Sequence, residues 1–304
     1  MEKQKLICIG GPTGVGKTAL AIEIANKFNG EIISCDSIAI YKGLDIGSAK
    51  PTVEEQKQAK HYLIDIVEPN DEFSVAEYVE NARKVINDIS SRGKMPIVVG
   101  GTGLYMKCLL YEMALGNSDK SIEIREKYNK FATENGNQAV YDYLCSIDAE
   151  SAKELHPNDI KKVIRAIEIF ETTGKKKSQL KTEVESKYDY LMIFLNTDRK
   201  TLYDRINLRV EKMIECGLEN EVKNLIKTYH LTRENQSMEA IGYKEFFDYF
   251  ENKTNLQETI DLIKLNSRHY AKRQITWFKK MPNVIECDYK LKDEIMKKVE
   301  NFLK

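Results

Sequence analysis

The sequence feature that most constrains the fold is a phosphate-binding loop near the N-terminus. Glycines in such a loop let successive backbone N–H groups point at one anion, and the start of the following helix adds its positive dipole end. The apolar run Leu6–Ile9 precedes the loop and a helical pattern over residues 19–28 follows it. We therefore predict that the chain binds a di- or triphosphate. The pattern G-x-x-x-x-G-K-[ST] is matched by Gly11, Pro12, Thr13, Gly14, Val15, Gly16, Lys17 and Thr18.

Two side chains of this loop carry chemistry of their own. Lys17 can reach the outer phosphate of a bound ligand, and the hydroxyl of Thr18 can hold a Mg²⁺ ion. Mg²⁺ is accordingly the one cofactor that the motif predicts.

Composition narrows the class of protein further. The 304 residues suffice for two domains, and 47 basic residues balance 47 acidic ones. Because the formal net charge is zero, any surface that attracts nucleic acid must be local. The six cysteines form no C-x-x-C pair, which is typical of reduced thiols and excludes a zinc site of that spacing. The sequence has no signal-peptide profile and no membrane-spanning apolar run, so we expect a cytoplasmic protein without membrane association.

Apolar runs that alternate with helical patterns predict an α/β fold. The runs are Leu6–Ile9, Glu31–Cys35, His61–Val67, Pro96–Val99 and, as the expected last strand, Tyr190–Leu195. Strands that alternate with helices form a parallel sheet covered on both faces, here of the phosphate-loop NTPase type. We assign residues 1–115 and 188–304 to this core and its C-terminal helices. Residues 121–187 show helical periodicity and no convincing strand, so residues 116–187 are interpreted as a helical insertion domain.

Capping signals locate several helices. A capping box at Ser74 and Glu77 opens a helix that is expected to run to Ser91. The helix expected over residues 159–173 is closed by Gly174. Further helices are predicted over residues 201–216, 219–229 and 238–250, and a long helix over 257–280 with a capping box at Thr254 and Gln257.

Polar residues follow two of the predicted strands, where open α/β sheets place their ligand contacts. Asp36 can accept a proton or position Mg²⁺, and it can equally cap a turn. Thr102 offers a hydroxyl to a ligand, with helix capping as an equal alternative. Asp65 resembles a metal-proximal aspartate only weakly, and a structural role is the stronger interpretation.

Two basic clusters lie in separate parts of the chain. Residues 264–280 contain six basic side chains, no acidic one, and three interleaved aromatic rings. A second cluster, Lys161, Lys162 and Arg165, is followed by three lysines at 175–177. A run of charges is usually only a solvated helix face. In a charge-balanced chain, however, acid-free clusters on two domains favour a phosphate-backbone surface that grips a polyanion.

Several longer motifs carry a resemblance to a known family. They read DSIAIYKGLDIGSAKP at 36–51, FSVAEY at 73–78, PIVVGGTGLY at 96–105, HPND at 156–159, AIGYKE at 240–245 and YAKRQITWF at 270–278. With these motifs the chain resembles the bacterial tRNA dimethylallyltransferases (tRNA isopentenyltransferases) over nearly its whole length. The resemblance implies a prenyltransferase that moves a dimethylallyl group from dimethylallyl diphosphate to N6 of the adenosine adjacent to the anticodon, with release of diphosphate.

The resemblance also implies roles for individual residues. The loop at 11–18 would hold the donor diphosphate, assisted by Lys17, Thr18 and Arg209, while Asp36 would accept the proton from adenine N6. Residues expected to contact the anticodon stem-loop of the tRNA are Asp36, Ser37, Ile38, Ala39, Thr102, Arg125, Lys161, Lys162, Arg165, Tyr243, Lys244, Lys272, Arg273, Gln274 and Trp277. A monomer is expected.

Two positions depart from the family pattern. Ala39 and Glu239 stand where glutamine is common, which leaves the RNA contacts of these segments open. Alternative functions are a phosphate-loop nucleotide or small-molecule kinase, a prenyltransferase acting on free adenine nucleotides, and a non-catalytic RNA-binding protein. A kinase would leave the basic C-terminal helix without a use, and the intact Lys17, Thr18 and Asp36 argue against a loop that has lost its activity.

Overall fold

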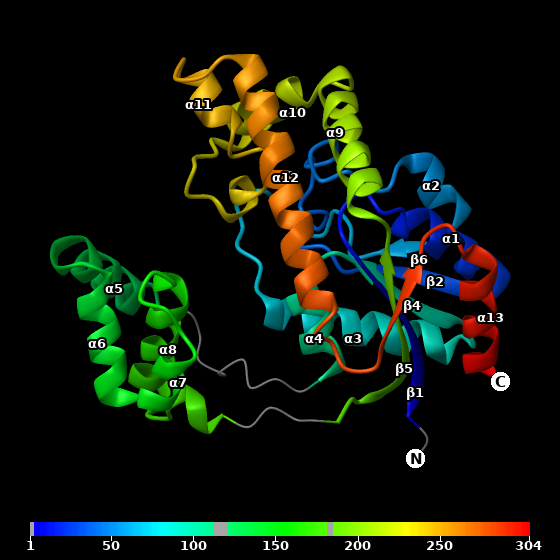
Figure 1. Cartoon of the computed structure of the whole chain (residues 1–304), viewed down its shortest axis with the longest axis horizontal. Helices are drawn as coiled ribbons and strands as arrows, with labels where there is room; N and C mark the ends of the chain where they lie inside the picture. The colour runs from blue at the N-terminus through cyan, green and yellow to red at the C-terminus, as the bar shows by residue number, and fades with distance from the viewer. Residues whose placement is uncertain (1–2, 112–120, 181–184) are drawn as a thin grey trace. The chain divides into compact units, whose positions relative to one another are not determined.

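The computed structural model describes residues 3–111, 121–180 and 185–304, which divide into two compact units (Figure 1). The first unit comprises Met1–Leu110 and Ser186–Lys304, and the second comprises Tyr111–Glu185. The expected domain boundary at residues 115 and 116 lies outside the described residues.

The first unit is built on a six-stranded parallel sheet, which confirms the predicted α/β class. Its strands lie in the order β3-β2-β4-β1-β5-β6. Because the strands are parallel, their carboxyl ends meet at one edge, where ligand sites form in sheets of this kind. The strand bounds are β1 Gln4–Gly10, β2 Gly30–Ser34, β3 His61–Tyr62, β4 Met95–Gly100, β5 Tyr188–Asn196 and β6 Val284–Asp288.

Two strand predictions were wrong. The run His61–Val67 gives only two strand residues, because the backbone enters the left-handed region at Leu63 (φ 60°) and Asp65 (φ 55°). Tyr190–Leu195 is not the last strand, since β6 follows it at the edge of the sheet. The missed strand β6 is short and carries two acidic residues among five, so it lacks the apolar run of a buried strand.

Helices cover both faces of the sheet (Figure 1). Alternate strand residues such as Ile7 and Ile9 share one core cluster with side chains of α1, α9 and α13. The helix α3 packs on β2 and β4, and its capping box at Ser74 and Glu77 is confirmed. The helices of this unit are α1 Lys17–Lys27, α2 Val53–Gln58, α3 Val75–Ser91, α4 Gly103–Leu110, α9 Arg199–Glu215, α10 Leu218–Tyr229, α11 Phe246–Phe250, α12 Leu256–Phe278 and α13 Lys292–Leu303.

Two helix predictions in the C-terminal part need correction. The helix expected over residues 238–250 is a 3-10 turn at Gln236–Glu239 followed by the short α11, because the left-handed Gly242 (φ 94°) interrupts it. The long helix α12 is capped by Asn255 and Glu258 rather than by Thr254 and Gln257. The side chain of Thr254 instead shares a hydrogen bond with the hydroxyl of Thr259.

The second unit is a helical bundle with its own core. Its helices are α5 Ile122–Asn135, α6 Asn137–Ile147, α7 Ala149–Lys153 and α8 Ile160–Thr173. Buried side chains of α5, α6 and α8, among them Tyr128, Leu144 and Val163, pack together. Gly174 ends α8 in the left-handed conformation (φ 67°), as predicted from the sequence. This unit therefore has the cluster of buried apolar side chains that a domain needs to fold around.

Candidate active site

The phosphate-binding loop joins the carboxyl end of β1 to the start of α1. Gly14 (φ 80°) and Gly16 (φ 103°) occupy the left-handed region, which side chains other than glycine rarely adopt. Gly16 is the N-cap of α1, and no described side chain caps this helix start. The first N–H groups of α1 are thus left for an anion at the positive end of the helix dipole.

The side chain of Lys17 folds back over the loop. Its ammonium group donates hydrogen bonds to the carbonyl oxygens of Gly11 (3.0 Å) and Pro12 (2.9 Å). Burial of the ammonium group and the nearby charge of Arg209 lower the pKa of Lys17 to about 8, although Asp36 opposes the shift. An ammonium group that is poorly neutralised in the free protein favours an incoming anion.

Two arginines of α9 face the loop. Arg209 donates to the hydroxyl of Thr13 (3.3 Å) and to the carbonyl of Ala49 (3.4 Å), and burial holds its pKa below the usual range. Arg205, one helical turn earlier, lines the same cavity beside Gly16 and stacks on the ring of Tyr289 (4.6 Å). We did not predict Arg205 from the sequence. Its spacing of four residues from Arg209 in a predicted helix was a usable signal, because such residues share one helix face.

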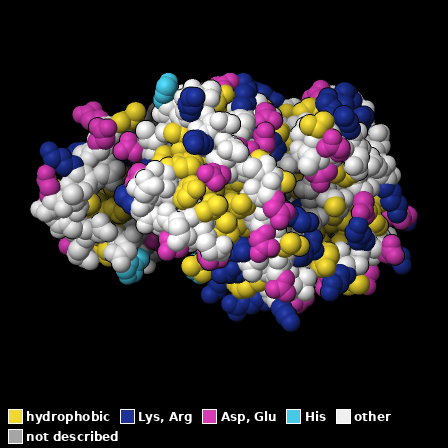
Figure 2. Space-filling model, turned by 90° about the horizontal axis from the view of Figure 1, so that it is seen from above, with side chains coloured by type: hydrophobic (Ala, Val, Ile, Leu, Met, Phe, Trp, Pro, Cys, Tyr) yellow, Lys and Arg dark blue, Asp and Glu magenta, His cyan; other side chains and the backbone are white. Residues whose placement is uncertain are grey.

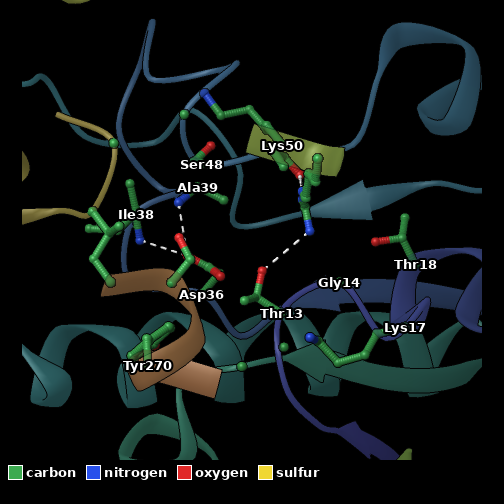
Figure 3. A pocket seen from close by; sticks show the side chains of 18 of the residues that line it. Thr13, Gly14, Lys17, Thr18, Asp36, Ile38, Ala39, Ser48, Lys50 and Tyr270 are labelled. Carbon is green, nitrogen blue, oxygen red and sulfur yellow. Dashed lines mark hydrogen bonds between the residues drawn. The ribbon is translucent and has the colours of Figure 1, made fainter. Parts of the chain in front are cut away.

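Asp36 follows β2, where its carboxylate caps a turn and also lines the cavity beside the phosphate loop. Its Oδ1 atom accepts hydrogen bonds from the backbone N–H groups of Ile38 (2.9 Å) and Ala39 (3.3 Å), so Asp36 does cap a turn (Figure 3). It also lines the same cavity as Lys17 and Thr18. The two amides fix the carboxylate in one orientation toward this cavity, which is what a proton acceptor requires.

Thr102, which follows β4, forms hydrogen bonds with Ser37, which follows the neighbouring strand β2. Its hydroxyl accepts a hydrogen bond from the backbone N–H of Ser37 (3.1 Å) and donates to the hydroxyl of Ser37 (3.4 Å). The side chain of Tyr270 on α12, labelled in Figure 3, forms a hydrogen bond with the side chain of Thr102. Burial, followed by the charge of Asp36, raises the pKa of Tyr270 to about 12, so the phenol stays protonated at neutral pH.

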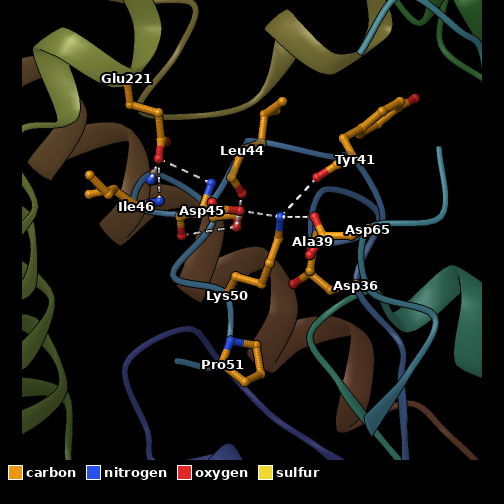
Figure 4. Close-up of polar contacts among 12 residues, drawn as sticks. Asp36, Ala39, Tyr41, Leu44, Asp45, Ile46, Lys50, Pro51, Asp65 and Glu221 are labelled. Atoms are coloured by element: carbon orange, nitrogen blue, oxygen red, sulfur yellow. Dashed lines mark hydrogen bonds and ion pairs between the residues drawn. The ribbon is translucent and has the colours of Figure 1, made fainter. Parts of the chain in front are cut away.

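The loop at 41–51 is held by a buried lysine that sequence analysis did not single out. The ammonium group of Lys50 donates to the carbonyl of Tyr41 (2.9 Å), to Asp45 (2.5 Å) and to Asp65 (2.6 Å) (Figure 4). Its side chain is only 4% exposed. This pairing gives Asp65 a structural role, the stronger of its two interpretations.

A carboxylate of α10 supports the same loop from the other side. Glu221 accepts hydrogen bonds from the backbone N–H groups of Asp45 (3.2 Å), Ile46 (2.8 Å) and Gly47 (3.2 Å), as Figure 4 shows in part. The hydroxyl of Tyr243 donates to the same carboxylate (2.7 Å). Successive N–H groups form an anion-binding nest, which Glu221 fills from within the protein.

These elements enclose a cavity of about 980 Å³ in the first unit. The cavity is large enough for a small ligand together with part of a second one. Its lining combines the phosphate loop, the strand ends, and α9 and α12, and includes Thr13, Lys17, Thr18, Asp36, Ser37, Ile38, Ala39, Lys50, Arg205, Arg209, Glu239, Lys244, Tyr270, Arg273 and Gln274.

The helix α12 presents its basic side chains unevenly. Lys272, Arg273 and Trp277 are exposed, as an RNA-contacting surface requires. Gln274 is 5% exposed, and both ends of its amide are bonded within the protein. Tyr243 is likewise fully buried, whereas the neighbouring Lys244 is exposed. The geometry therefore argues against direct RNA contacts by the side chains of Gln274 and Tyr243.

The predicted RNA-contacting residues of the second unit cluster on α5 and α8. Arg125 grips the fully buried Glu168 through two hydrogen bonds of 2.9 Å, and Arg165 donates a third of 2.6 Å. Burial alone would raise the pKa of Glu168, but these bonds outweigh it and hold the pKa below the usual range. Lys161 and Lys162 are exposed on the first turns of α8. The two arginines are thus oriented by a carboxylate, and the lysines face solvent.

Charges are mixed over the face of the molecule that Figure 2 shows. In the view of Figure 2, basic and acidic side chains are interspersed, in keeping with the zero formal net charge. A polyanion must therefore bind at local basic clusters, as composition indicated.

The residues around the phosphate loop fit a Mg²⁺ site with one protein ligand, the hydroxyl of Thr18. Within the described parts of the chain, His, Cys, Asp and Glu side chains form no group of three that could hold a metal ion. The hydroxyl of Thr18 lines the cavity beside the phosphate loop (Figure 3). A single hydroxyl at this place suits a Mg²⁺ ion whose other ligands are phosphate oxygens and water.

Among the residues that the structure describes, no helix is long and apolar enough to cross a membrane.

A parallel sheet with this loop at the end of β1 and cationic side chains around it defines a phosphate-loop α/β protein. The family model described as IPP transferase matches residues 39–281, and the chain belongs to this family, which confirms the family expected from the sequence.

Curated relatives cover almost the whole chain. The tRNA dimethylallyltransferase of Bacillus cytotoxicus is 49% identical over 289 residues, which are 94% of this chain and 91% of the relative. The tRNA dimethylallyltransferase of Thermoanaerobacter sp. is 46% identical over 98% of this chain and 97% of its own length.

Solved structures agree with this placement. The full-length tRNA isopentenylpyrophosphate transferase from Bacillus halodurans superposes with a TM-score of 0.75 at 42% identity, over 99% of this chain and 97% of that one. A eukaryotic dimethylallyltransferase acting on tRNA gives a TM-score of 0.81 at 32% identity, over 94% of this chain and 74% of the other.

Proposed function

We propose that this protein is a tRNA dimethylallyltransferase, which transfers a dimethylallyl group from dimethylallyl diphosphate to N6 of the adenosine adjacent to the anticodon and releases diphosphate. The observation that carries the proposal is the meeting of an anion-binding loop and an oriented carboxylate in one cavity. Lys17 and Arg209 serve the anion, and Asp36 serves the acceptor. The acceptors of the relatives named above support tRNA as the substrate class.

The donor side of the cavity suits the departure of diphosphate. An allylic C–O bond breaks readily when the negative charge that develops on the leaving oxygen is neutralised. The N–H groups at the start of α1, together with Lys17, Arg205 and Arg209, supply fixed positive charge for this purpose. A Mg²⁺ ion held by Thr18 and the diphosphate oxygens would add Lewis-acid stabilisation when bound.

The acceptor side suits proton removal from a weakly basic amine. As the bond between N6 and the allylic carbon forms, the bond from that carbon to the diphosphate oxygen breaks, and one N6 proton passes to Asp36. The backbone amides of Ile38 and Ala39 hold Oδ1 of Asp36 in place, so the carboxylate needs no reorganisation to accept the proton.

The tRNA partner accounts for the exposed basic residues. Lys272, Arg273 and Trp277 on α12 and Lys161 and Lys162 on α8 offer phosphate and stacking contacts to an anticodon stem-loop. The target adenine has to leave its stack before it can enter a cavity of this kind. We further propose that the enzyme acts in the cytoplasm as a monomer.

Mass spectrometry of bulk tRNA tests this function. Unmodified tRNA incubated with the protein, Mg²⁺ and dimethylallyl diphosphate should gain the mass of one dimethylallyl group at the adenosine beside the anticodon. AMP in place of tRNA should give no product, which separates this activity from prenylation of free nucleotides. Phosphate transfer from ATP to a small molecule, with no prenyl transfer, would instead establish a kinase and contradict the proposal.

A further inference from the structure

The side chain of Gln274 bridges two loops at the carboxyl ends of neighbouring strands. Its Oε1 atom accepts a hydrogen bond from the backbone N–H of Thr13 (2.9 Å), in the phosphate loop after β1. Its Nε2 atom donates to the carbonyl of Gly101 (3.0 Å), in the turn after β4. The amide is buried, so both bonds form in a medium where an unpaired polar group is costly.

The helix that carries Gln274 approaches these loops very closely. A Cβ atom on Gly10 would overlap the ring of Phe278, one on Gly101 the amide of Gln274, and one on Gly103 the indole of Trp277. The absence of side chains at these three glycines is what lets the last turns of α12 rest on the backbone of the strand ends. A shift of α12 would therefore also change the conformation of the phosphate loop.

Thr13 is held from two sides. Its backbone N–H is fixed by Gln274 of α12, and its hydroxyl accepts from Arg209 of α9. The loop that must present its amides to a diphosphate is thus pinned to the protein at this residue. Preorganised donors of this kind need not pay the cost of ordering when the anion arrives.

We propose that Gln274 is a positioning residue, which sets the conformation of the diphosphate loop through the Thr13 amide and does not itself contact RNA. The inference rests on the proposed function in one respect, which is that the anion bound by the loop is the diphosphate of the donor. Its exposed neighbours Lys272 and Arg273 carry the contacts to tRNA, whereas Gln274 faces the donor loop.

Gln274→Met tests the proposal, because methionine nearly matches glutamine in size and makes neither hydrogen bond. We expect the dissociation constant for Mg-pyrophosphate, measured by calorimetry, to rise about tenfold, the effect of one such hydrogen bond. The dissociation constant for tRNA should stay within about twofold of the wild type, a change too small to reflect a lost contact. Hydrogen exchange of the Thr13 amide should become faster, since its acceptor is removed.

Thr259→Val is the matched control on the same helix. Thr259 is buried, and its hydroxyl donates to the carbonyl of Asn255 (3.0 Å) far from the loop. The substitution removes both hydrogen bonds of this hydroxyl, to Asn255 and to Thr254, without changing the side-chain size. Thr259→Val should lower the melting temperature about as much as Gln274→Met does. It should leave pyrophosphate affinity and the exchange of the Thr13 amide unchanged.

The outcomes separate this inference from the proposed function. Unchanged pyrophosphate affinity and unchanged Thr13 exchange in Gln274→Met would overturn the positioning role. A loss of tRNA affinity with normal pyrophosphate binding would make Gln274 an RNA contact and overturn it as well. A wild-type protein that binds no pyrophosphate would contradict the proposed function itself, and exchange of the Thr13 amide would still report whether Gln274 holds the loop.

Discussion

The guanidinium group of Arg209 donates a hydrogen bond to the hydroxyl of Thr13 across 196 residues of sequence (3.3 Å). This bond places a cation of α9 at the phosphate loop that follows β1. Burial lowers the pKa of Arg209, and the guanidinium nevertheless stays charged at neutral pH. The C-terminal half of the chain thereby completes an anion site whose loop lies in the N-terminal half.

Arg209→Ala should lower prenyl transfer roughly 10²- to 10³-fold, the usual cost of removing one preorganised donor to a developing anion. Arg209→Lys keeps the charge but loses the planar fork, so it should recover only part of the rate. Single-turnover rates with saturating tRNA measure both effects. Arg199→Ala is the control on the same helix, because Arg199 stacks on Tyr203 and lies outside the cavity lining. Equal rates for Arg209→Ala and Arg199→Ala would remove Arg209 from the mechanism.

Lys17 should make donor binding depend on pH. Its pKa is lowered to about 8 in the free protein, first by burial and then by Arg209. A bound diphosphate stabilises the ammonium form, so binding takes up a proton once the pH exceeds about 8. Pyrophosphate affinity should therefore fall as the pH rises through this value, by up to about tenfold per pH unit.

The control for this pH profile is Lys17→Arg, which stays charged over the whole range. Subtracting its profile from that of the wild type removes the titration of pyrophosphate itself. The wild-type protein alone should show the loss of pyrophosphate affinity above pH 8, and parallel profiles would contradict a titrating Lys17.

Lys17→Ala should abolish prenyl transfer while tRNA binding stays intact.

Asp36→Asn separates proton acceptance from turn capping. The amide oxygen of asparagine can still accept from the backbone N–H groups of Ile38 and Ala39, so the turn and the melting temperature should be kept. An amide cannot take the N6 proton, and the single-turnover rate should drop roughly 10²- to 10⁴-fold. Asp36→Ala, which loses the turn as well, should also lower the melting temperature. A normal rate for Asp36→Asn would leave the residue with its structural role only, and rescue by excess Mg²⁺ would point to a metal-positioning role.

Lys272→Ala combined with Arg273→Ala should weaken tRNA binding and reduce its salt dependence. Both side chains are exposed on α12, and each phosphate contact releases about one counterion. The slope of log affinity against log salt should therefore become shallower by up to about two. Lys297→Ala with Lys298→Ala on α13 makes the same charge change on another exposed helix. If the two double variants behaved alike, only the net charge would matter and α12 would not be the binding surface.

Local patterns determined much of what this protein is. The glycines and Lys17 of the phosphate loop, the apolar runs of β1, β2, β4 and β5, and the capping box at Ser74 each depend on residues close together in sequence. Their turn chemistry and periodicity are readable without knowledge of the fold. The longer motifs, such as residues 36–51 and 270–278, indicated the family for the same reason.

Only the tertiary structure decided which side chains face the cavity and which are buried beneath it. Within the basic stretch of α12, packing on Gly10 and Gly101 buries Gln274 and leaves Lys272 and Arg273 exposed to solvent. The buried hydroxyl of Tyr243 donates to Glu221, and the buried ammonium group of Lys50 pairs with Asp45 and Asp65. These outcomes depend on contacts between segments far apart in sequence, whose partners no local periodicity specifies.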